Sequence, residues 1–347
     1  MGTGDTRYLF GLGISLYARW GPRLKPFSVA DEAPHDLAKG LSTVRQPLTF
    51  FLNGSALKVS TPTLAPKLER WAQASGVDAH FTSPTLKQLP KAVKDAVDAG
   101  RLPIAVGGDG TAHQLAQCLP DGASFAPLPL GSGNDFATAL GWSSNLTRAL
   151  EQLNTAQSMP LDCLQASQSN APVFKTLSVA GWGFAADVNR EANASTVPGS
   201  LQYPVGVLQA LAKGGTRPVR LTIDDKTVIE DRFWTVLACN TSMAGGGMKF
   251  APDADPQDGM MEVLALGDVS TLGLIGLLGR VYFGRHLGHR QVKLWRCRSL
   301  VIEPLEEEPG TWSPLLAEGD SYAGAASTRF EVKPAGLSVL VPTPAHR

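Results

Sequence analysis

The stretch Leu102-Pro-Ile-Ala-Val-Gly-Gly-Asp-Gly-Thr111 decides the fold. Its apolar start, residues 102–106, has the length and composition of a buried parallel strand. The glycines that follow carry no Cβ atoms, so backbone N–H groups can approach an anion closely. A helix is expected over residues 111–119, and its partial positive N-terminus faces the same point. Taken alone, such a turn is as often a simple connection between a strand and a helix as a phosphate-binding site.

The same strand, loop and helix pattern repeats on both sides of this stretch. This alternation is typical of a parallel α/β sheet. Right-handed crossovers bring the loops after the strands to one edge of the sheet, where they can form a nucleotide pocket. The expected strands cover 48–52, 77–81, 102–106 and 125–130, the helices cover 62–75 and 86–99, and the further edge loops are Asn53-Gly-Ser55 and Gly131-Ser-Gly-Asn-Asp135.

The pattern changes after about Leu161. Short strand candidates separated by turns follow, with few helices between them, which predicts a mainly antiparallel β-sandwich or flattened barrel. One helix-like segment, residues 272–289, is rich in Leu and Gly and ends in basic residues. The expected strands cover 174–180, 219–223, 233–240, 261–265, 291–297, 300–303 and 330–332.

Three parts are therefore expected. They are an extension of unknown role over residues 1–46, an α/β nucleotide-binding domain over 47–161 and a β-sandwich domain over 162–347. The last segment of the chain is a candidate to return to the first domain.

Composition excludes several classes of protein. Apolar residues make up 43% of the chain, charged residues 18%, and the formal net charge is zero. These values argue against disorder and against a strongly basic nucleic-acid binder. The four cysteines are scattered without a CxxC pair, which favours thiols in a reducing compartment over a disulfide or zinc framework. No apolar run approaches the roughly 20 residues that cross a bilayer. We expect a cytoplasmic protein.

Two glycine motifs and several downstream segments resemble one known family. Gly107-Gly-Asp-Gly-Thr111 and Pro129-Leu-Gly-Ser-Gly-Asn-Asp-Phe-Ala137 are similar to motifs of the diacylglycerol kinase and sphingosine kinase catalytic superfamily. The similarity is best to its bacterial soluble lipid kinases and runs in order from Pro47 to Val341. The further matching segments are Gly181-Trp-Gly-Phe-Ala-Ala-Asp187, Ala244-Gly-Gly-Gly-Met-Lys-Phe-Ala-Pro-Asp-Ala-Asp-Pro-Gln-Asp-Gly-Met260 and Gly284-Arg-His286.

The resemblance implies a two-domain kinase. Its first domain would be similar to that of phosphofructokinase-like and NAD kinases, and a lipid would enter the cleft between the domains. ATP and Mg²⁺ are the implied cofactors, and Asp109 would act catalytically through a Mg²⁺ ion that offsets its repulsion of phosphate. Ser132 stands where the family more often has threonine. The implied nucleotide contacts are Asn53, Thr82, Gly107, Gly108, Asp109, Gly110, Thr111, Gly131, Ser132, Gly133 and Asn134.

A metal site of the second domain is implied at the turn Asp255-Pro-Gln-Asp-Gly-Met260. Asp255, Asp258 and the carbonyl of Met260 would supply hard oxygen ligands for a structural Mg²⁺ ion. A plain turn without a metal is the alternative, because Asp-Pro and Asp-Gly form turns by themselves.

The resemblance also implies a catalytic base near the C-terminus. The family has an Asp-Gly-Glu triplet there, and this chain has Glu318-Gly-Asp320, with the two acids exchanged. By position Asp320 is the base, with Glu318 and a simple surface turn as alternatives. Two further departures from the family pattern are the first loop, which lacks the Asn-Pro-x-Ser-Gly form, and Ala112-His-Gln114, where an Asn-Glu pair is typical.

The predicted function is transfer of the γ-phosphate of ATP to a lipid hydroxyl, with diacylglycerol as the leading acceptor. Sphingoid-type lipids, a soluble acceptor and a catalytically weak nucleotide sensor stay open as alternatives. The apolar run over residues 272–283 before a basic cluster also predicts transient contact with the inner face of the membrane, although a buried amphipathic helix explains the same pattern. The oligomeric state, including a homodimer, is left open.

Overall fold

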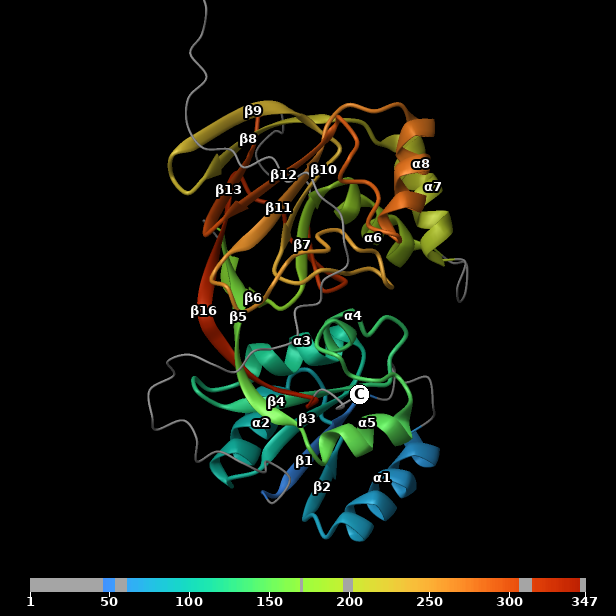
Figure 1. The fold of residues 1–347 in the computed structure, drawn as a ribbon, viewed down its shortest axis with the longest axis vertical. Helices are drawn as coiled ribbons and strands as arrows, with labels where there is room; N and C mark the ends of the chain where they lie inside the picture. Colours follow the sequence, from blue (N-terminus) through green and yellow to red (C-terminus); the bar gives the residue numbers. More distant parts are fainter. Residues whose placement is uncertain (1–45, 54–60, 169–170, 196–201, 306–313, 344–347) are drawn as a thin grey trace, which may run out of the picture. The chain divides into compact units, whose positions relative to one another are not determined.

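The structure is a computed structural model that describes residues 46–53, 61–168, 171–195, 202–305 and 314–343. The predicted extension before Gln46 and the loop residues Gly54 and Ser55 lie outside the described residues. Figure 1 shows the fold. No helix among the described residues is long and apolar enough to cross a membrane.

Four parallel strands form the core of a first lobe, in the order β2-β1-β3-β4. All residues of β1 and β3 are buried, as expected for strands covered on both faces. Helix α2 buries Leu89, Val93 and Ala96, a stripe at helical spacing. The lobe comprises β1 (Leu48–Leu52), α1 (Thr61–Ser75), β2 (Ala79–Thr82), α2 (Leu89–Asp98), β3 (Leu102–Gly107), α3 (Asp109–Cys118), β4 (Ser124–Pro129), α4 (Asp135–Ala139) and α5 (Leu146–Leu153).

Two long strands, β5 (Gln157–Gln168) and β16 (Thr328–Val341), are shared with a second lobe. They pair antiparallel from Thr328↔Gln168 to Val341↔Gln157, with a register shift between Lys333 and Leu337. Beyond the shift β16 runs parallel to β4, and before it β16 pairs antiparallel with a strand of the second lobe. The last of the described strands, β16, therefore completes the sheet of the first lobe.

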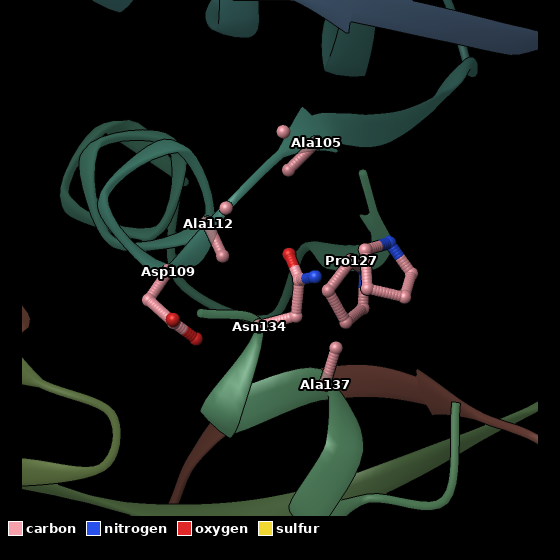
Figure 2. A pocket seen from close by; sticks show the side chains of 9 residues that line it. Ala105, Asp109, Ala112, Pro127, Asn134 and Ala137 are labelled. Carbon is pink, nitrogen blue, oxygen red and sulfur yellow. The ribbon is translucent and has the colours of Figure 1, made fainter. Parts of the chain in front are cut away.

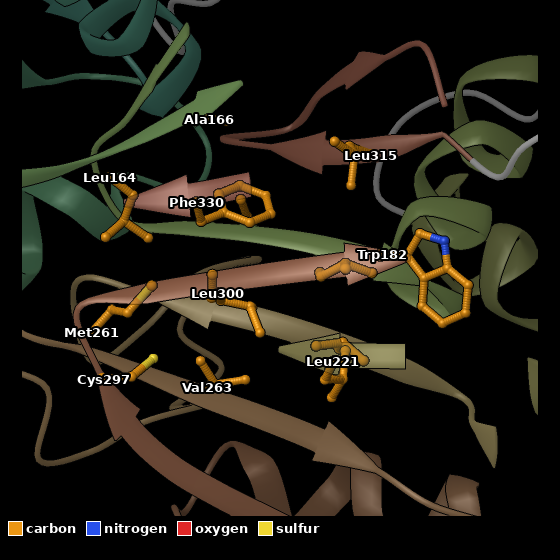
Figure 3. Packing of buried hydrophobic residues seen from close by; sticks show 14 of the residues in the cluster. Leu164, Ala166, Trp182, Leu221, Met261, Val263, Cys297, Leu300, Leu315 and Phe330 are labelled. Atoms are coloured by element: carbon orange, nitrogen blue, oxygen red, sulfur yellow. The ribbon is translucent and has the colours of Figure 1, made fainter. Parts of the chain in front are cut away.

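The second lobe is a sandwich of antiparallel strands. One layer continues the shared sheet through β16-β13-β8-β9, and the other is a separate six-stranded sheet in the order β12-β11-β10-β7-β14-β15. Figure 3 shows the apolar core between the layers, with Trp182 and Leu221 among its members. The strands are β6 (Ala171–Thr176), β7 (Val179–Gly183), β8 (Arg217–Ile223), β9 (Thr227–Phe233), β10 (Thr235–Cys239), β11 (Met261–Leu266), β12 (Val292–Cys297), β13 (Ser299–Pro304), β14 (Leu315–Ala317) and β15 (Asp320–Tyr322).

Three helices pack beside the second lobe: α6 (Phe184–Ala194), α7 (Gln202–Lys213) and α8 (Thr271–Val281). They share one apolar cluster and lie side by side in Figure 1. The sequence predicted fewer helices here, and that expectation was wrong. The segment expected as a helix to His289 ends at Val281, because the chain turns back and the Val281 carbonyl accepts the N–H of Gly284, whose φ is +64°.

The predicted strand over residues 174–180 is in fact two strands in different sheets. The chain breaks between β6 and β7 at Leu177 and Ser178, whose backbone groups bond to side chains and to the backbone of Asn240 instead of continuing a ladder. The cysteines are free thiols, as expected, and Cys163, Cys239 and Cys297 are buried.

Replacement of Leu340 by alanine tests the dependence of the first lobe on β16. Leu340 is fully buried in the core of that lobe although it lies at the end of the chain. Leu340→Ala is expected to lower the free energy of unfolding by about 2–5 kcal/mol through lost burial and a cavity. Urea unfolding measures the change, with Leu305→Ala, at a 42% exposed position, as the control. Equal stability of the two variants would contradict the shared core.

Candidate functional site

Two glycine loops of the first lobe lie backbone against backbone. The carbonyl oxygen of Gly107 accepts the N–H groups of Leu130 at 2.9 Å and Gly131 at 3.0 Å. A Cβ atom on Gly131 would lie 2.3 Å from the Cα atom of Gly108. Since no side chain fits there, the two loops can meet only as glycines.

The edge of the sheet brings the first loop to the same place. The Asn53 amide donates to the Thr111 hydroxyl at 3.1 Å, and a Cβ atom on Gly107 would lie 2.3 Å from that hydroxyl oxygen. Thr82 lies at this edge, one strand away, because it pairs with Phe51 of β1. Asn53, Gly107 and Thr111 therefore form one packed group, in which the Thr111 side chain is buried.

Polar bonds fix the loop that follows β4. Asn134, with φ +65°, closes a ring with Gly131 through two bonds of 2.9 Å. The carboxylate of Asp109 accepts the N–H of Phe136 at 2.9 Å, and a Cβ atom on Gly133 would lie 2.7 Å from its other oxygen. Figure 2 shows Asp109 and Asn134 on the rim of a small hollow under the two loops. Ser132 is exposed beside it.

Asp135 joins the two lobes. Its carboxylate accepts the N–H groups of Gly246 and Gly247, each at 2.6 Å, from the second lobe. The side chain is buried, and burial raises its pKa while the two N–H groups oppose the rise and the Asp109 carboxylate adds to it. The sequence pattern predicted no role for Asp135, although this residue closes the Gly-Ser-Gly-Asn-Asp motif.

The Glu318-Gly319-Asp320 triplet forms the hairpin between β14 and β15. Both Glu318 (φ +51°) and Gly319 (φ +86°) have positive φ, as a type I′ turn requires, and this is costly for a glutamate. The N–H groups of Leu177 and Ser178 bind the Glu318 carboxylate, and Asn189 donates to the Gly319 carbonyl at 3.1 Å. These bonds hold the turn in its strained conformation.

Burial raises the pKa of Glu318 to about 8, and the nearby negative charge of Asp109 adds to the rise. Asp109 also raises the pKa of Asp135. The negative charge of Asp109 therefore acts on the carboxyl groups of both Asp135 and Glu318 at the junction of the lobes.

Two of the three departures from the family pattern, the Glu318-Gly-Asp320 triplet and Ala112-His-Gln114, touch each other. The Gln114 amide on α3 donates to the Asp320 carboxylate at 2.6 Å. The preceding residue, His113, bonds through Nε2 to the Tyr322 hydroxyl at 2.7 Å and is fully buried, which lowers its pKa to about 4. The helix that begins at the glycine loop therefore holds the turn that carries Asp320. The sequence contained both residues of the pair, but nothing in it showed that they meet.

The predicted metal turn is occupied by an ion pair. The Asp258 carboxylate binds the Arg296 guanidinium and accepts the N–H of Met260 at 2.9 Å. Asp255 accepts the N–H of Gln257 at 3.1 Å. The part of the chain that the structure describes contains no group of three or more His, Cys, Asp and Glu side chains placed to hold a metal. As arranged, these side chains do not fit a divalent cation unless Arg296 moves away.

Two family models match the two lobes of the chain. The model of the diacylglycerol kinase catalytic domain matches residues 47–166, and that of the YegS C-terminal NAD kinase beta sandwich-like domain matches residues 178–341. The "Probable lipid kinase YegS-like" of Pseudomonas aeruginosa (strain UCBPP-PA14) is 30% identical over 256 residues, 72% of this chain and 80% of the relative. The chain belongs to the diacylglycerol kinase-like family of lipid kinases. The resemblance inferred from the motifs is confirmed.

Other members of this lipid kinase family match over more of their length. The diacylglycerol kinase of Mycobacterium tuberculosis (strain ATCC 25618 / H37Rv) is 26% identical over 316 residues, which cover 89% of this chain and 96% of the relative. The crystal structure of a diacylglycerol kinase from Bacillus anthracis superposes with a TM-score of 0.63 at 20% identity, over 86% of this chain and 97% of the other. That superposition, together with the sandwich-domain match, confirms the predicted fold class.

Glu318→Gln tests the buried carboxyl group at the turn. With a folded pKa near 8 against an ordinary value of 4.5, the folded state binds more protons than the unfolded state between these values, so stability falls as pH rises through that interval. The Glu318→Gln variant has no ionisable carboxyl group at this position, so it does not lose stability in this way as the pH rises. Thermal unfolding from pH 5 to pH 8 is expected to show wild type losing stability relative to the variant by a few degrees.

The exposed change Glu69→Gln is the control for Glu318→Gln, and it should follow wild type at every pH. Parallel curves for wild type and Glu318→Gln would show that Glu318 is ionised in the folded protein.

Arg296→Gln tests whether the Asp258 turn can hold a cation. Removing the guanidinium leaves the Asp258 carboxylate without its partner. Mg²⁺ is expected to raise the melting temperature of this variant more than that of wild type, because a ligand that binds only the folded state stabilises it. Arg298→Gln, two residues along the same strand region, is the control. No effect of Mg²⁺ on any of the proteins would mean that the predicted metal turn is wrong.

Proposed function

We propose that this chain is an ATP- and Mg²⁺-dependent phosphotransferase that phosphorylates a lipid hydroxyl, with diacylglycerol as the leading acceptor. The observation that carries the proposal is the bond between Gln114 and Asp320. Through this bond Asp320 of one lobe contacts the helix of the other lobe that begins at the glycine loop, which supports the roles of base and phosphate cradle assigned to them here. The names of the M. tuberculosis and B. anthracis proteins support diacylglycerol as the acceptor.

The nucleotide phosphates are assigned to the start of α3. Among the described residues, the N–H groups of Gly108, Asp109 and Gly110 have no acceptor, and the space beside Gly110 is open. Backbone N–H groups at a helix N-terminus bind anions through their partial positive charge. The exposed Ser132 hydroxyl on the neighbouring loop is a further donor. Asn53 and Thr82 are the further residues assigned to the nucleotide at this edge of the sheet. Asn53 acts through its hydrogen bond to the Thr111 hydroxyl.

Asp109 is the residue assigned to Mg²⁺. Its negative charge raises the pKa of Asp135 and of Glu318, and a cation beside Asp109 would offset this repulsion. A bound Mg²⁺ ion would neutralise charge on the phosphates. The protein itself orients Asp109 through the bond from the Phe136 N–H.

Asp320 is the residue assigned to proton removal. The acceptor hydroxyl oxygen attacks the γ-phosphorus, the bond from that phosphorus to the β,γ-bridging oxygen breaks, ADP leaves, and the hydroxyl proton passes to Asp320. Glu318 is the weaker candidate, because a carboxyl group with a pKa near 8 is largely protonated at neutral pH. Gln114 donates only a hydrogen bond, so it orients Asp320 and leaves it able to accept the proton.

Activity on a panel of acceptors tests the proposal. Purified protein with labelled ATP and Mg²⁺ is expected to phosphorylate diacylglycerol in mixed micelles, and soluble alcohols should stay unlabelled. Transfer only to sphingoid lipids or to a soluble acceptor would show that diacylglycerol is not the acceptor. Nucleotide binding without transfer to any acceptor would identify a sensor and overturn the proposal.

Two substitutions test the assigned base. Asp320→Asn is expected to lower kcat by at least about 10²-fold while the affinity for ATP stays within twofold, because general-base catalysis is typically worth about 10²–10⁴-fold. Asp109→Asn should instead weaken the use of Mg²⁺-ATP. Retained activity in Asp320→Asn would exclude this residue as the base.

Gln114→Glu separates positioning from structure. A second carboxylate 2.6 Å from Asp320 is expected to raise the pKa of the pair, so the acidic limb of the pH–rate profile should move up by about one unit or more. Gln73→Glu, an exposed change on α1, should leave the profile unmoved. A loss of kcat that is equal at every pH would show that Gln114 acts only on the fold.

A further inference from the structure

Helix α8 exposes large apolar side chains to solvent. On the helix Leu272 is 81% and Ile275 47% exposed, and in the turn directly after it Tyr282 is 48% and Phe283 71% exposed, although the opposite stripe of the helix, with Leu274 and Leu277, is buried. A surface helix normally turns a polar face outward, and a helix that is apolar all round is found in a core or against lipid. This face is therefore available for a partner.

The segment that carries this apolar face, residues 269–302, is basic, and the exposed Asp268 directly precedes it. No Asp or Glu occurs from Val269 to Ile302. Arg280 and Arg285 are exposed beside the apolar side chains, and neither forms an ion pair within the described residues. The Arg285 guanidinium lies 6.0 Å from the centre of the Phe283 ring. Lys249, also exposed, joins this end of the helix, because its N–H donates to the Val281 carbonyl at 3.1 Å.

We infer that the outer face of α8 and of the turn that follows it, formed by Leu272, Ile275, Tyr282 and Phe283 with Arg280, Arg285 and Lys249, docks the protein on an anionic lipid bilayer. The inference rests in part on the proposed function, because a lipid acceptor must be collected from a bilayer. The apolar side chains enter the boundary between headgroups and acyl chains, and the cations bind lipid phosphates.

The positive charge of this face favours an anionic bilayer over a second copy of this chain as the docking partner. Two copies that met through α8 would bring Arg280 and Arg285 of each against like charges, without an acidic residue from the segment 269–302 to offset them. An anionic membrane surface neutralises the same cations and receives the apolar side chains at once. Helix α7, which shares a core with α8, exposes a further leucine, Leu208, at 63%.

The docking face is also connected to the candidate site. The segment that follows Gly246 and Gly247 leads directly to Lys249 and Phe250, and the Phe250 carbonyl bonds to His286 beyond α8 at 2.9 Å. The same two glycines bind Asp135 of the first lobe. Docking through α8 therefore occurs next to the contact that joins the lobes.

Vesicle sedimentation with the full chain tests the inference. Binding is expected to be stronger to phosphatidylcholine vesicles that contain phosphatidylglycerol than to phosphatidylcholine alone, and to fall as salt is raised. The double variant Leu272→Ser/Phe283→Ser should lower the partition coefficient by about tenfold or more. Arg280→Glu/Arg285→Glu should lower it by a similar factor, on anionic vesicles only.

Matched changes elsewhere control for general effects. Val228→Ser removes another exposed apolar side chain, and Arg148→Glu reverses another exposed arginine. Both should bind like wild type. Unchanged binding in both α8 variants would overturn the inference. Loss of a dimer in light scattering, with vesicle binding unchanged, would assign the face to a second copy.

A kinase assay on a short-chain diacylglycerol dispersed as monomers keeps the two proposals apart. The α8 variants should keep wild-type activity there and lose it on vesicles. Vesicle binding without lipid phosphorylation would leave the docking face standing and reject the proposed function. Phosphorylation of dispersed lipid with no vesicle binding would reject only the docking face.

Discussion

The antiparallel ladder of β5 and β16 is the constraint on which the rest of the structure depends. It belongs to both lobes, and its register shifts between Lys333 and Leu337, where the chain leaves one lobe for the other. The buried carboxylate of Asp162 holds this point, accepting the N–H groups of Ala335 at 2.9 Å and Gly259 at 2.7 Å. Asp162 thus links the bulge of β16, where the strand bends, to the turn that carries Asp258 through hydrogen bonds.

From this ladder a line of polar contacts leads to the candidate site. Asn240 donates to the carbonyls of Asp162 at 2.9 Å and Leu177 at 2.7 Å, and the N–H of Leu177 binds the Glu318 carboxylate. Buried polar groups are costly unless they are bonded, so the network admits few alternative arrangements. It fixes the turn from the second lobe, and Gln114 meets that turn from the first.

The sequence predicted the local units well, because their signals are local. Apolar runs and glycine turns specified the parallel strands and the loops around Gly107 and Gly131, and the order of motifs indicated the family. Contacts between distant residues had no such signal. Gln114 and Asp320 are separated by about 200 positions, and the Arg296 guanidinium at Asp258 comes from a different strand. The length of β16 was also missed, because its exposed middle breaks the apolar pattern.

The shared ladder also has a consequence for biosynthesis. The strand that borders β4, β16, follows every other described strand of the second lobe along the chain, so the sheet of the first lobe lacks this neighbour until those strands have been synthesised. Leu340 fills the core of that lobe from the same strand, and its carbonyl accepts the indole N–H of Trp142 at 3.1 Å. Domains of larger proteins usually fold in order as they emerge from the ribosome. In this protein the lobe that is made first is finished last.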